Sequence, residues 1–346
     1  MNQNIIQAIN SSFVGPKRDI YNIPLLINFL TQTNTDIDKI CIVGTPYGLL
    51  LYLLFIGNSK NTLFIFYGNY PLASAIENLR KNHYVCLELD NIKLSHKENE
   101  LNLSIVDFIA SHLNQYSIPV YGQDTSPFIA KFINERFTLF EDGRISYISK
   151  FDAQKTKGFH VSIYNEGISS IIYTGLEKIP LCLREISTLV DIKVLWKSLP
   201  SDQQKFVQDI FGFNASKLNV LLATGHDTIL FTRNYAKAGK CKYSEQVNMY
   251  KDVLSNYDAN KVIIKPHPND NVDYLQIFKD NIVLPSSIPA ELIWLCDLKI
   301  NRVVSVDDSS NIFGTLDNVA IDLYPEMIDK YNIINTRNNI KKEDGN

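Results

Sequence analysis

With 346 residues, the chain is long enough to bury a large core and to form two domains rather than one. Its content of 45% hydrophobic and 21% charged residues is that of an ordinary globular protein. The net charge of −3 argues against a nucleic-acid binder, because such a protein needs a basic face to displace counterions.

Cysteine usage and hydropathy indicate a cytoplasmic protein. The five cysteines are odd in number and widely spaced, which fits a reducing compartment and suggests no zinc module. Residues 1–4 lack the basic stretch and apolar core of a signal peptide, and the longest apolar run, residues 49–56, is too short to span a bilayer. Any membrane association is therefore expected to be peripheral, at the inner face of the cytoplasmic membrane.

The first half of the chain alternates between strand and helix patterns. Short apolar runs predict strands at residues 39–43, 62–66, 84–89, 119–122 and 138–140. Longer segments between them predict helices at residues 49–56, 71–82, 105–115 and 127–135. Strands separated by helices indicate parallel βαβ units.

The alternation pauses in the middle of the chain and then resumes. Residues 151–216 contain helix-like stretches at 185–199 and 202–211, and we interpret them as an inter-domain segment or the start of a second domain. The second half is predicted to have strands at residues 218–222, 262–264 and 303–306, and helices at 244–256 and after Pro289. We therefore expect two Rossmann-like domains facing a central cleft: residues 1–155, and residues 156–325 with 156–216 partly linker, followed by a tail at 326–346.

Lys265-Pro266-His267-Pro268 directly follows a predicted strand. The carboxyl end of a strand is where open α/β sheets bind ligands, and the two prolines restrict the backbone around the imidazole. A histidine held there can donate a hydrogen bond to a phosphate or protonate it as it leaves. Taken alone, the motif is better explained as a turn histidine, with Lys265 a solvated charge beside it.

Two further polar motifs follow predicted strands. Glu141 and Asp142 precede Gly143, and taken alone they suit an acidic turn between two strands. Ser309 and Ser310 open a helix candidate, where hydroxyls and free N–H groups form an anion site, although serine also caps helices without any ligand. The rival pair Ser286-Ser287 follows a weaker strand, so we prefer the later pair.

The order of these motifs, an acid-acid-Gly turn, then Lys-Pro-His-Pro, then Ser-Ser, resembles the bacterial sialyltransferases that decorate lipooligosaccharide and capsule. Glycosyltransferase family 52 is the most similar, and the capsular polysialyltransferases come next. The resemblance implies an α/β fold of the GT-B type. It also implies an inverting, metal-independent transfer of N-acetylneuraminic acid from CMP-Neu5Ac to a terminal sugar, galactose, of a bacterial surface glycan, with no cofactor.

The resemblance also implies roles for the motif residues. Asp142 would be the general base, with Glu141 supporting the turn or tuning the pKa of its neighbour. His267 would contact the departing phosphate together with Ser309 and Ser310. Pro268, Lys265 and Glu291 would complete the CMP site, with Glu291 on the ribose hydroxyls; a glutamate in the first turn of a helix equally favours the helix dipole.

Other strand ends provide weaker candidates. Thr224 and Gly225 follow the strand predicted at 218–222, which suggests contact with the nucleotide or the sugar carboxylate. In the first half, four residues at strand ends are acceptor-side candidates: Thr45, Tyr47, Gln123 and Asp124. Asp307-Asp308 resembles a metal site, but we interpret these acids as strand-end or helix-capping groups, with no metal.

Three alternatives stay open at this stage. The donor could be another CMP-nonulosonic acid such as CMP-Kdo. The chain could also be a non-catalytic nucleotide- or glycan-binding protein with the same fold, or a sugar-nucleotide epimerase that recognises UDP. Some relatives dimerise, so both a monomer and a homodimer fit the resemblance.

Overall fold

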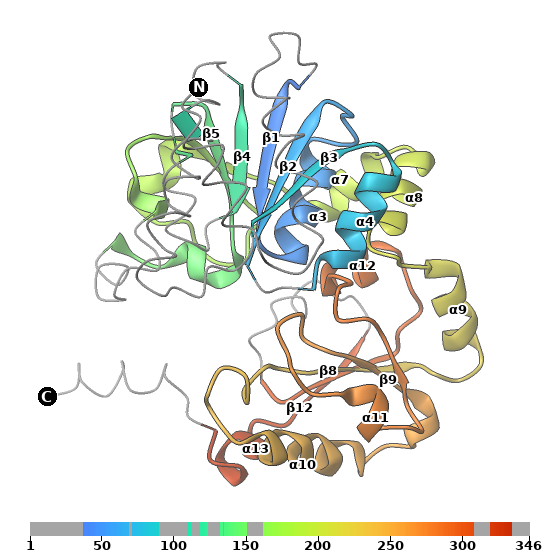
Figure 1. Cartoon of the computed structure of the whole chain (residues 1–346). Coiled ribbons are helices and arrows are strands. Elements are labelled where there is room, and N and C mark those ends of the chain that lie inside the picture. Colours follow the sequence, from blue (N-terminus) through green and yellow to red (C-terminus); the bar gives the residue numbers. More distant parts are fainter. Residues whose placement is uncertain are drawn as a thin grey trace, which may run out of the picture. The chain divides into compact units, whose positions relative to one another are not determined.

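The computed structural model describes residues 37–68, 71–89, 110–111, 118–123, 132–133, 135–150, 162–307 and 319–333. The chain divides into two compact units, Met1–Ile210 and Phe211–Asn346, each with its own parallel sheet (Figure 1). The two α/β units expected from the sequence are therefore present. Their boundary lies after residue 210 rather than near residue 155, because β6 (Ile168–Tyr173) and β7 (Ser187–Leu189) extend the first sheet.

The first sheet has seven parallel strands in the order β3-β2-β1-β4-β5-β6-β7. Its other strands are β1 (Lys39–Val43), β2 (Thr62–Tyr67), β3 (Val85–Leu89), β4 (Val120–Gln123) and β5 (Phe137–Phe140). These are the five strands predicted for the first half, and each end lies within one residue of its prediction. β1 and β2 are almost entirely buried, as expected for parallel strands covered on both faces.

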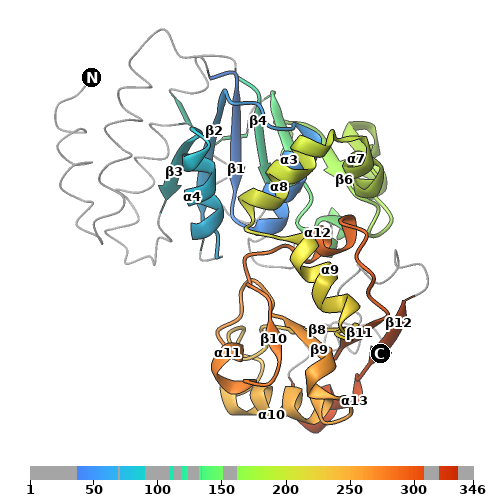
Figure 2. The ribbon, with the colours of Figure 1, turned by 90° about the vertical axis from the view of Figure 1, so that its right-hand side faces the viewer.

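Helices α3 (Pro46–Phe55), α4 (Ala73–Lys81), α7 (Ile192–Ser198) and α8 (Ser201–Ile210) gather on one face of this sheet (Figure 2). They confirm the helices predicted at 49–56, 71–82 and 202–211. The helices predicted at 105–115 and 127–135 lie largely outside the described residues. The helix predicted at 185–199 is wrong in its first part, because β7 occupies residues 187–189 and α7 begins only after its cap, Asp191.

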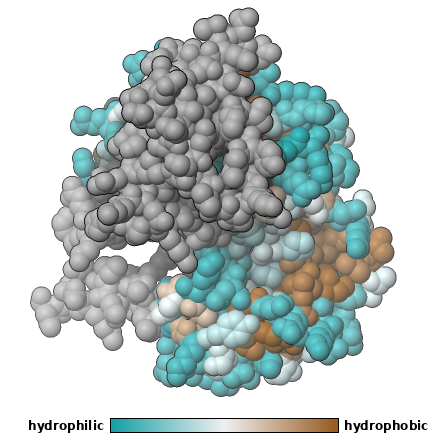
Figure 3. Space-filling model, in the orientation of Figure 1, coloured by the Kyte–Doolittle hydropathy of each residue, from teal (hydrophilic) through white to brown (hydrophobic). Residues whose placement is uncertain are grey.

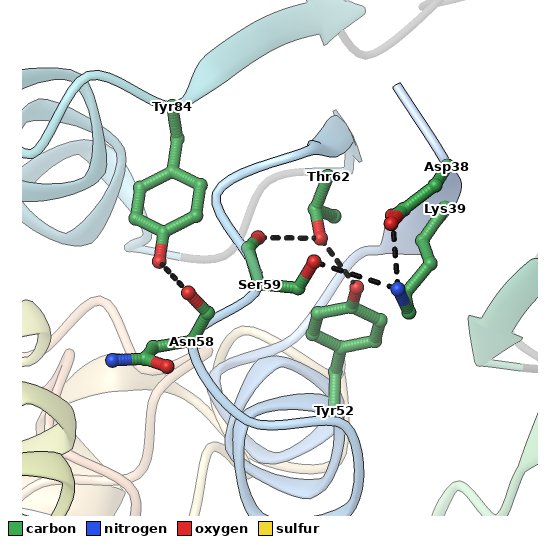
Figure 4. A network of polar contacts seen from close by, with 7 residues as sticks. All are labelled: Asp38, Lys39, Tyr52, Asn58, Ser59, Thr62 and Tyr84. Atoms are coloured by element: carbon green, nitrogen blue, oxygen red, sulfur yellow. Dashed lines mark hydrogen bonds and ion pairs between the residues drawn. The ribbon is translucent and has the colours of Figure 1, made fainter. Parts of the chain in front are cut away.

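A network of polar contacts closes the amino edge of the first sheet, where the loop after α3 enters β2 (Figure 4). The hydroxyls of Tyr52 and Thr62, both buried, lie 2.7 Å apart, and Thr62 Oγ1 donates to the carbonyl of Ser59 at 2.9 Å. Tyr84 donates to the carbonyl of Asn58 at 2.9 Å. Because these hydroxyls are satisfied within the fold, the network holds the loop in place, and ligands are expected at the opposite, carboxyl edge.

The second sheet has five parallel strands in the order β10-β9-β8-β11-β12. They are β8 (Thr228–Phe231), β9 (Val262–Lys265), β10 (Ile282–Val283), β11 (Arg302–Ser305) and β12 (Ala320–Leu323). Its helices include α10 (Tyr243–Leu254), α11 (Tyr274–Ile277) and α12 (Ala290–Leu295). The strands predicted at 262–264 and 303–306, and the helices predicted at 244–256 and after Pro289, are confirmed.

Residues 218–222 belong to helix α9 (Ala215–Ala223) and do not form the predicted strand. Asn214 caps this helix by accepting a hydrogen bond from the Lys217 N–H at 2.8 Å. Leu218 and Leu222 point inward, whereas Val220 between them is 64% exposed. Burial at positions i and i+4 marks one face of a helix, so the apolar run misled the strand prediction.

The predicted C-terminal tail begins with a helix of the second unit, α13 (Glu326–Lys330). The Lys330 ammonium lies 2.6 Å from the Asp252 carboxylate on α10, and Ile333 is buried in the core of this unit. The chain therefore stays part of the second unit at least as far as residue 333.

Polar residues cover most of the visible described surface of the first unit, and apolar residues gather on the visible face of the second unit (Figure 3). Large exposed apolar side chains of the second unit include Val220, Leu275, Ile321 and Leu323. None of the helices in the described ranges is long and apolar enough to cross a bilayer.

Candidate functional site

The predicted acid pair lies at the carboxyl edge of the first sheet. Glu141 and Asp142 directly follow β5, and Gly143, with a φ of 65°, begins a short 3-10 helix at Gly143–Tyr147. The Asp142 N–H donates to Ser146 Oγ at 2.7 Å, which holds the turn. The motif therefore joins a strand to a helical turn, not to the second strand of a hairpin.

Glu141 is fully buried and accepts hydrogen bonds from several donors. They are the Tyr47 hydroxyl at 2.6 Å, the Thr174 N–H at 2.9 Å, and the hydroxyls of Tyr147 and Thr174. Burial, and then the charge of Glu141, raises the pKa of Tyr147, so its hydroxyl keeps its proton and donates. The carboxylate thus ties together the ends of β5 and β6 and the start of α3.

Asp142 is half-buried, and neighbouring strand ends hold its carboxylate in place. The Gln123 amide donates to Asp142 Oδ1 at 2.9 Å and accepts at its own oxygen from the Thr45 hydroxyl at 2.5 Å. Thr45 in turn accepts from the Gly48 N–H at 3.0 Å as the cap of α3. This chain of bonds crosses the ends of β1, β4 and β5, and its last member, Asp142, is the one acid of the pair that is part-exposed.

The structure brings three of the four acceptor-side candidates together around the acid pair. Thr45 and Gln123 are buried and orient Asp142, while Tyr47 holds Glu141. A side chain at Gly48 would meet Gln123 Oε1 at 2.3 Å, so glycine allows this close approach. The fourth candidate, Asp124, lies outside the described residues.

His267 lies at the carboxyl edge of the second sheet, just beyond β9. The backbone N–H of His267 donates to Thr232 Oγ1 at 3.1 Å. The ring Nδ1 accepts from the backbone N–H of Asn269 at 3.0 Å. The proton of the neutral ring is therefore on Nε2. Burial, followed by the charges of Arg233 and Lys265, lowers the pKa of His267 to about 3. At pH 7 the ring is neutral and offers a hydrogen-bond donor.

Lys265 is 2% exposed, so its prediction as a solvated charge is wrong. As the last residue of β9, it lies in a parallel sheet that is covered on both faces. Its ammonium donates to the carbonyls of Pro266 at 2.6 Å and Ser286 at 3.4 Å. Burial lowers its pKa to about 7, and the charge of Glu291 opposes this shift. Lys265 is therefore buried next to the histidine loop and is only partly protonated at pH 7.

Glu291 occupies the first turn of α12, as predicted, and is half-buried. Its charge acts on Lys265, which gives it a partner within the fold. Contact between Glu291 and a ribose stays a prediction. Pro268 is part of the same loop and has no N–H, so it contributes a fixed backbone.

Ser309 and Ser310 lie outside the described residues, as does Asp308. Asp307, which follows β11, accepts a hydrogen bond from the Tyr235 hydroxyl, and its carboxylate lies 3.5 Å from Arg233 Nε. Burial, and then the charge of Asp307, raises the pKa of Tyr235. Within the described ranges no group of three or more His, Cys, Asp or Glu residues could hold a metal ion.

Thr224 and Gly225 lie at the wrong edge of the sheet for the predicted role. They end α9 and lead into the amino end of β8, whereas His267 lies beyond the carboxyl end of β9. Because β8 and β9 are parallel, the two positions are on opposite edges. The error follows from the strand wrongly predicted at 218–222.

The sequence interpretation missed Thr232 and Arg233, which follow β8 at the same edge as His267. Buried side chains of α10 support them. The Gln246 amide donates to the Arg233 carbonyl at 2.7 Å and to Asp270 at 2.9 Å, and the Tyr250 hydroxyl accepts from the Arg233 N–H at 2.5 Å. The sequence could have identified both residues, because they directly follow the apolar run of β8, just as the histidine motif follows the apolar run of β9.

The different burial of the two adjacent acids predicts different costs of neutralising them. Glu141→Gln places an amide among groups that all donate, and should lower the free energy of unfolding by about 1–3 kcal/mol. Asp142→Asn keeps an oxygen that can accept from Gln123, and it should change the free energy of unfolding by less than about 0.5 kcal/mol. Urea denaturation of both variants measures this, and equal stability of the two would contradict the assignment.

The buried Lys265 predicts a pH-dependent stability. Its pKa of about 7 in the fold is below the value of an exposed lysine, so between these values the unfolded chain binds more protons. Stability should therefore rise as the pH increases from about 7 to about 10, and level off below about 7, where both states bind the proton. Denaturation of the wild type and Lys265→Met at pH 6 and pH 9 isolates this effect. The stability of the wild type relative to the variant should be greater at pH 9, and a difference independent of pH would contradict the burial of the charge.

Comparison with solved structures identifies the fold. An α/β-galactoside α-2,3-sialyltransferase from Photobacterium phosphoreum aligns with a TM-score of 0.50 and 15% identity, over 86% of this chain and 96% of that one. A 2,6-sialyltransferase from Photobacterium sp. JT-ISH-224 aligns with a TM-score of 0.56 and 14% identity, over 82% of this chain and 71% of that one. At this identity the likeness concerns the fold alone, which is the predicted GT-B type with two parallel α/β units.

Sequence comparison identifies the family. An uncharacterised protein of Haemophilus influenzae is 29% identical over 192 residues, which are 54% of this chain. The chain spans only 62% of the length of that curated relative. The model of glycosyltransferase family 52 matches residues 86–324, well over half of the chain, and covers the acid pair, His267 and the serine pair. The chain therefore belongs to glycosyltransferase family 52.

Proposed function

We propose that this chain is an inverting, metal-independent sialyltransferase. It moves N-acetylneuraminic acid from CMP-Neu5Ac to a terminal sugar, galactose, of a bacterial surface glycan. The observation that carries the proposal is the neutral His267 beside Arg233 and Lys265 at a sheet edge, a site suited to one phosphate. Membership of glycosyltransferase family 52 supports a sugar-nucleotide donor.

The proposed site for the donor phosphate lies in the second unit. The Nε2–H of His267 can donate to a phosphate oxygen, and the charges of Arg233 and Lys265 lie close enough to lower the pKa of the ring. These charges also favour an anion, because in a partly buried site they are only weakly screened. A CMP-sugar has a single phosphodiester, so these groups can balance the charge that a metal ion balances for pyrophosphate donors.

In the first unit, the proposed general base is Asp142. As the acceptor hydroxyl oxygen attacks the anomeric carbon, its proton moves to the Asp142 carboxylate. The bond from that carbon to the phosphate oxygen breaks on the opposite face, and its electron pair leaves with CMP, where the His267 donor stabilises it. Attack opposite the leaving group inverts the configuration.

The similarity in fold motivates the choice of substrates. The Photobacterium sp. JT-ISH-224 enzyme was solved as a ternary complex with the donor product CMP and the acceptor substrate lactose. We extend that chemistry to this chain as part of the proposal: CMP in the second unit and a galactose-ended acceptor on the Asp142 side.

Donor choice tests the proposed function directly. The purified chain should release CMP from CMP-Neu5Ac in the presence of lactose, equally well with and without EDTA. CMP-Kdo and UDP-sugars, tested in parallel, should be turned over far more slowly. Turnover of CMP-Kdo or a UDP-sugar in preference to CMP-Neu5Ac would contradict the donor, and CMP binding without any turnover would favour a non-catalytic binding protein.

Removing the His267 ring tests the phosphate site. His267→Ala should reduce turnover about 10²–10³-fold, the scale of losing one preorganised donor to a developing negative charge. Unfolding of the variant should be measured alongside, to confirm that the loop still forms. Near-normal turnover with CMP-Neu5Ac would show that another group meets the phosphate.

A further inference from the structure

Arg233 is a cation at the candidate donor site, and the proposed function uses only its charge and gives it no group of the donor to bind. β8 and β9 are neighbouring parallel strands with Phe231 opposite Lys265, and the Thr232 N–H donates to the Lys265 carbonyl at 3.2 Å. Arg233 and His267 each come two residues after this pair, and the charge of Arg233 acts on the His267 ring. Adjacent strands are about 5 Å apart, so the two residues can reach two groups of one small ligand.

The fold holds the backbone of Arg233 firmly. Its N–H donates to the Tyr250 hydroxyl at 2.5 Å, and its carbonyl accepts from the Gln246 amide at 2.7 Å. Tyr250 and Gln246 are both fully buried on α10. Such support fixes where the side chain leaves the backbone, as a recognition residue requires.

The guanidinium itself is less strongly engaged. Its nearest carboxylate is that of Asp307, 3.5 Å from Nε, and this carboxylate also accepts from the Tyr235 hydroxyl. Among the described residues Nε has no hydrogen-bond partner, although it is buried. The side chain is 27% exposed, so part of it remains open to a ligand.

We propose that Arg233 binds the sugar carboxylate of the donor, beside the phosphate bound by His267. The inference rests on the proposed function, since only a nonulosonic donor has a carboxylate on the carbon that bears the phosphate. Two anionic groups so close together repel each other, and two adjacent donor residues relieve this repulsion. The planar fork of an arginine matches the two oxygens of a carboxylate. Arg233 would therefore select ulosonic donors over aldose donors.

Binding measurements with a matched pair of ligands test this role. The first ligand is CMP-3-fluoro-Neu5Ac, a slowly reacting donor analogue, and the second is its methyl ester, in which a methyl group on the carboxyl removes the charge. The wild type should bind the acid about 10–100-fold more tightly than the ester, the scale of a hydrogen bond to a charged group. In Arg233→Gln this preference should disappear, and the affinity for CMP should fall by a smaller factor than the affinity for the acid.

Two further variants keep the experiment decisive. Lys237→Gln removes an exposed positive charge from the same loop, and its preference for the acid should stay close to that of the wild type. Arg233→Lys keeps the charge but loses the fork, so it should fold as the wild type does and lose most of the preference. It therefore tests the proposal even where Arg233→Gln unfolds.

The outcomes separate the two claims. If both Arg233 variants bind CMP, the acid and the ester more weakly by the same factor, Arg233 contacts the phosphate. That result would overturn this inference but not the proposed function. An unchanged preference for the acid would leave Arg233 as a partner of Asp307 and also overturn it. A wild type that binds neither CMP nor the analogue would overturn the proposed function and the inference together.

Discussion

Parallel strands impose the constraint on which the rest of the structure depends. All strands of a parallel sheet end at the same edge, so the residues that follow each strand meet there although they are distant in sequence. In the first unit this brings Thr45, Gln123 and Asp142 into one hydrogen-bonded chain. In the second unit it brings Thr232 against His267 and Asp307 against Arg233. The chemistry of each edge is therefore a consequence of the sheet order.

Burial assigns different tasks to groups that look alike in the sequence. Glu141 and Asp142 are adjacent acids. Glu141 is fully buried and accepts several hydrogen bonds, whereas Asp142 is half-buried and accepts one from Gln123. Lys265 and His267 share one motif, yet the lysine is almost completely buried and the histidine is half-buried. In both pairs the buried residue stabilises the turn that contains the other. The residue that supports the turn and the candidate site residue are therefore only one or two positions apart in the sequence.

The sequence was most informative where apolar runs are short and bounded. β1, β2, β5, β9 and β11 could be predicted almost to the residue, and with them the positions of Asp142 and His267. The prediction failed where an apolar run belongs to an amphipathic helix, as at Leu218 and Leu222, and Thr224 was misplaced as a result. Gln246 and Tyr250 could not be found, because their contacts with the Arg233 backbone depend on how α10 packs against the sheet.

The central claim is that His267 meets the phosphate of a cytidine nucleotide at the carboxyl edge of β9. A crystal structure of the chain with CMP tests it most directly. The account predicts a phosphate oxygen within hydrogen-bond distance of His267 Nε2, about 2.7–3.2 Å. A nucleotide bound elsewhere, with its phosphate away from the loop that follows β9, would contradict the account.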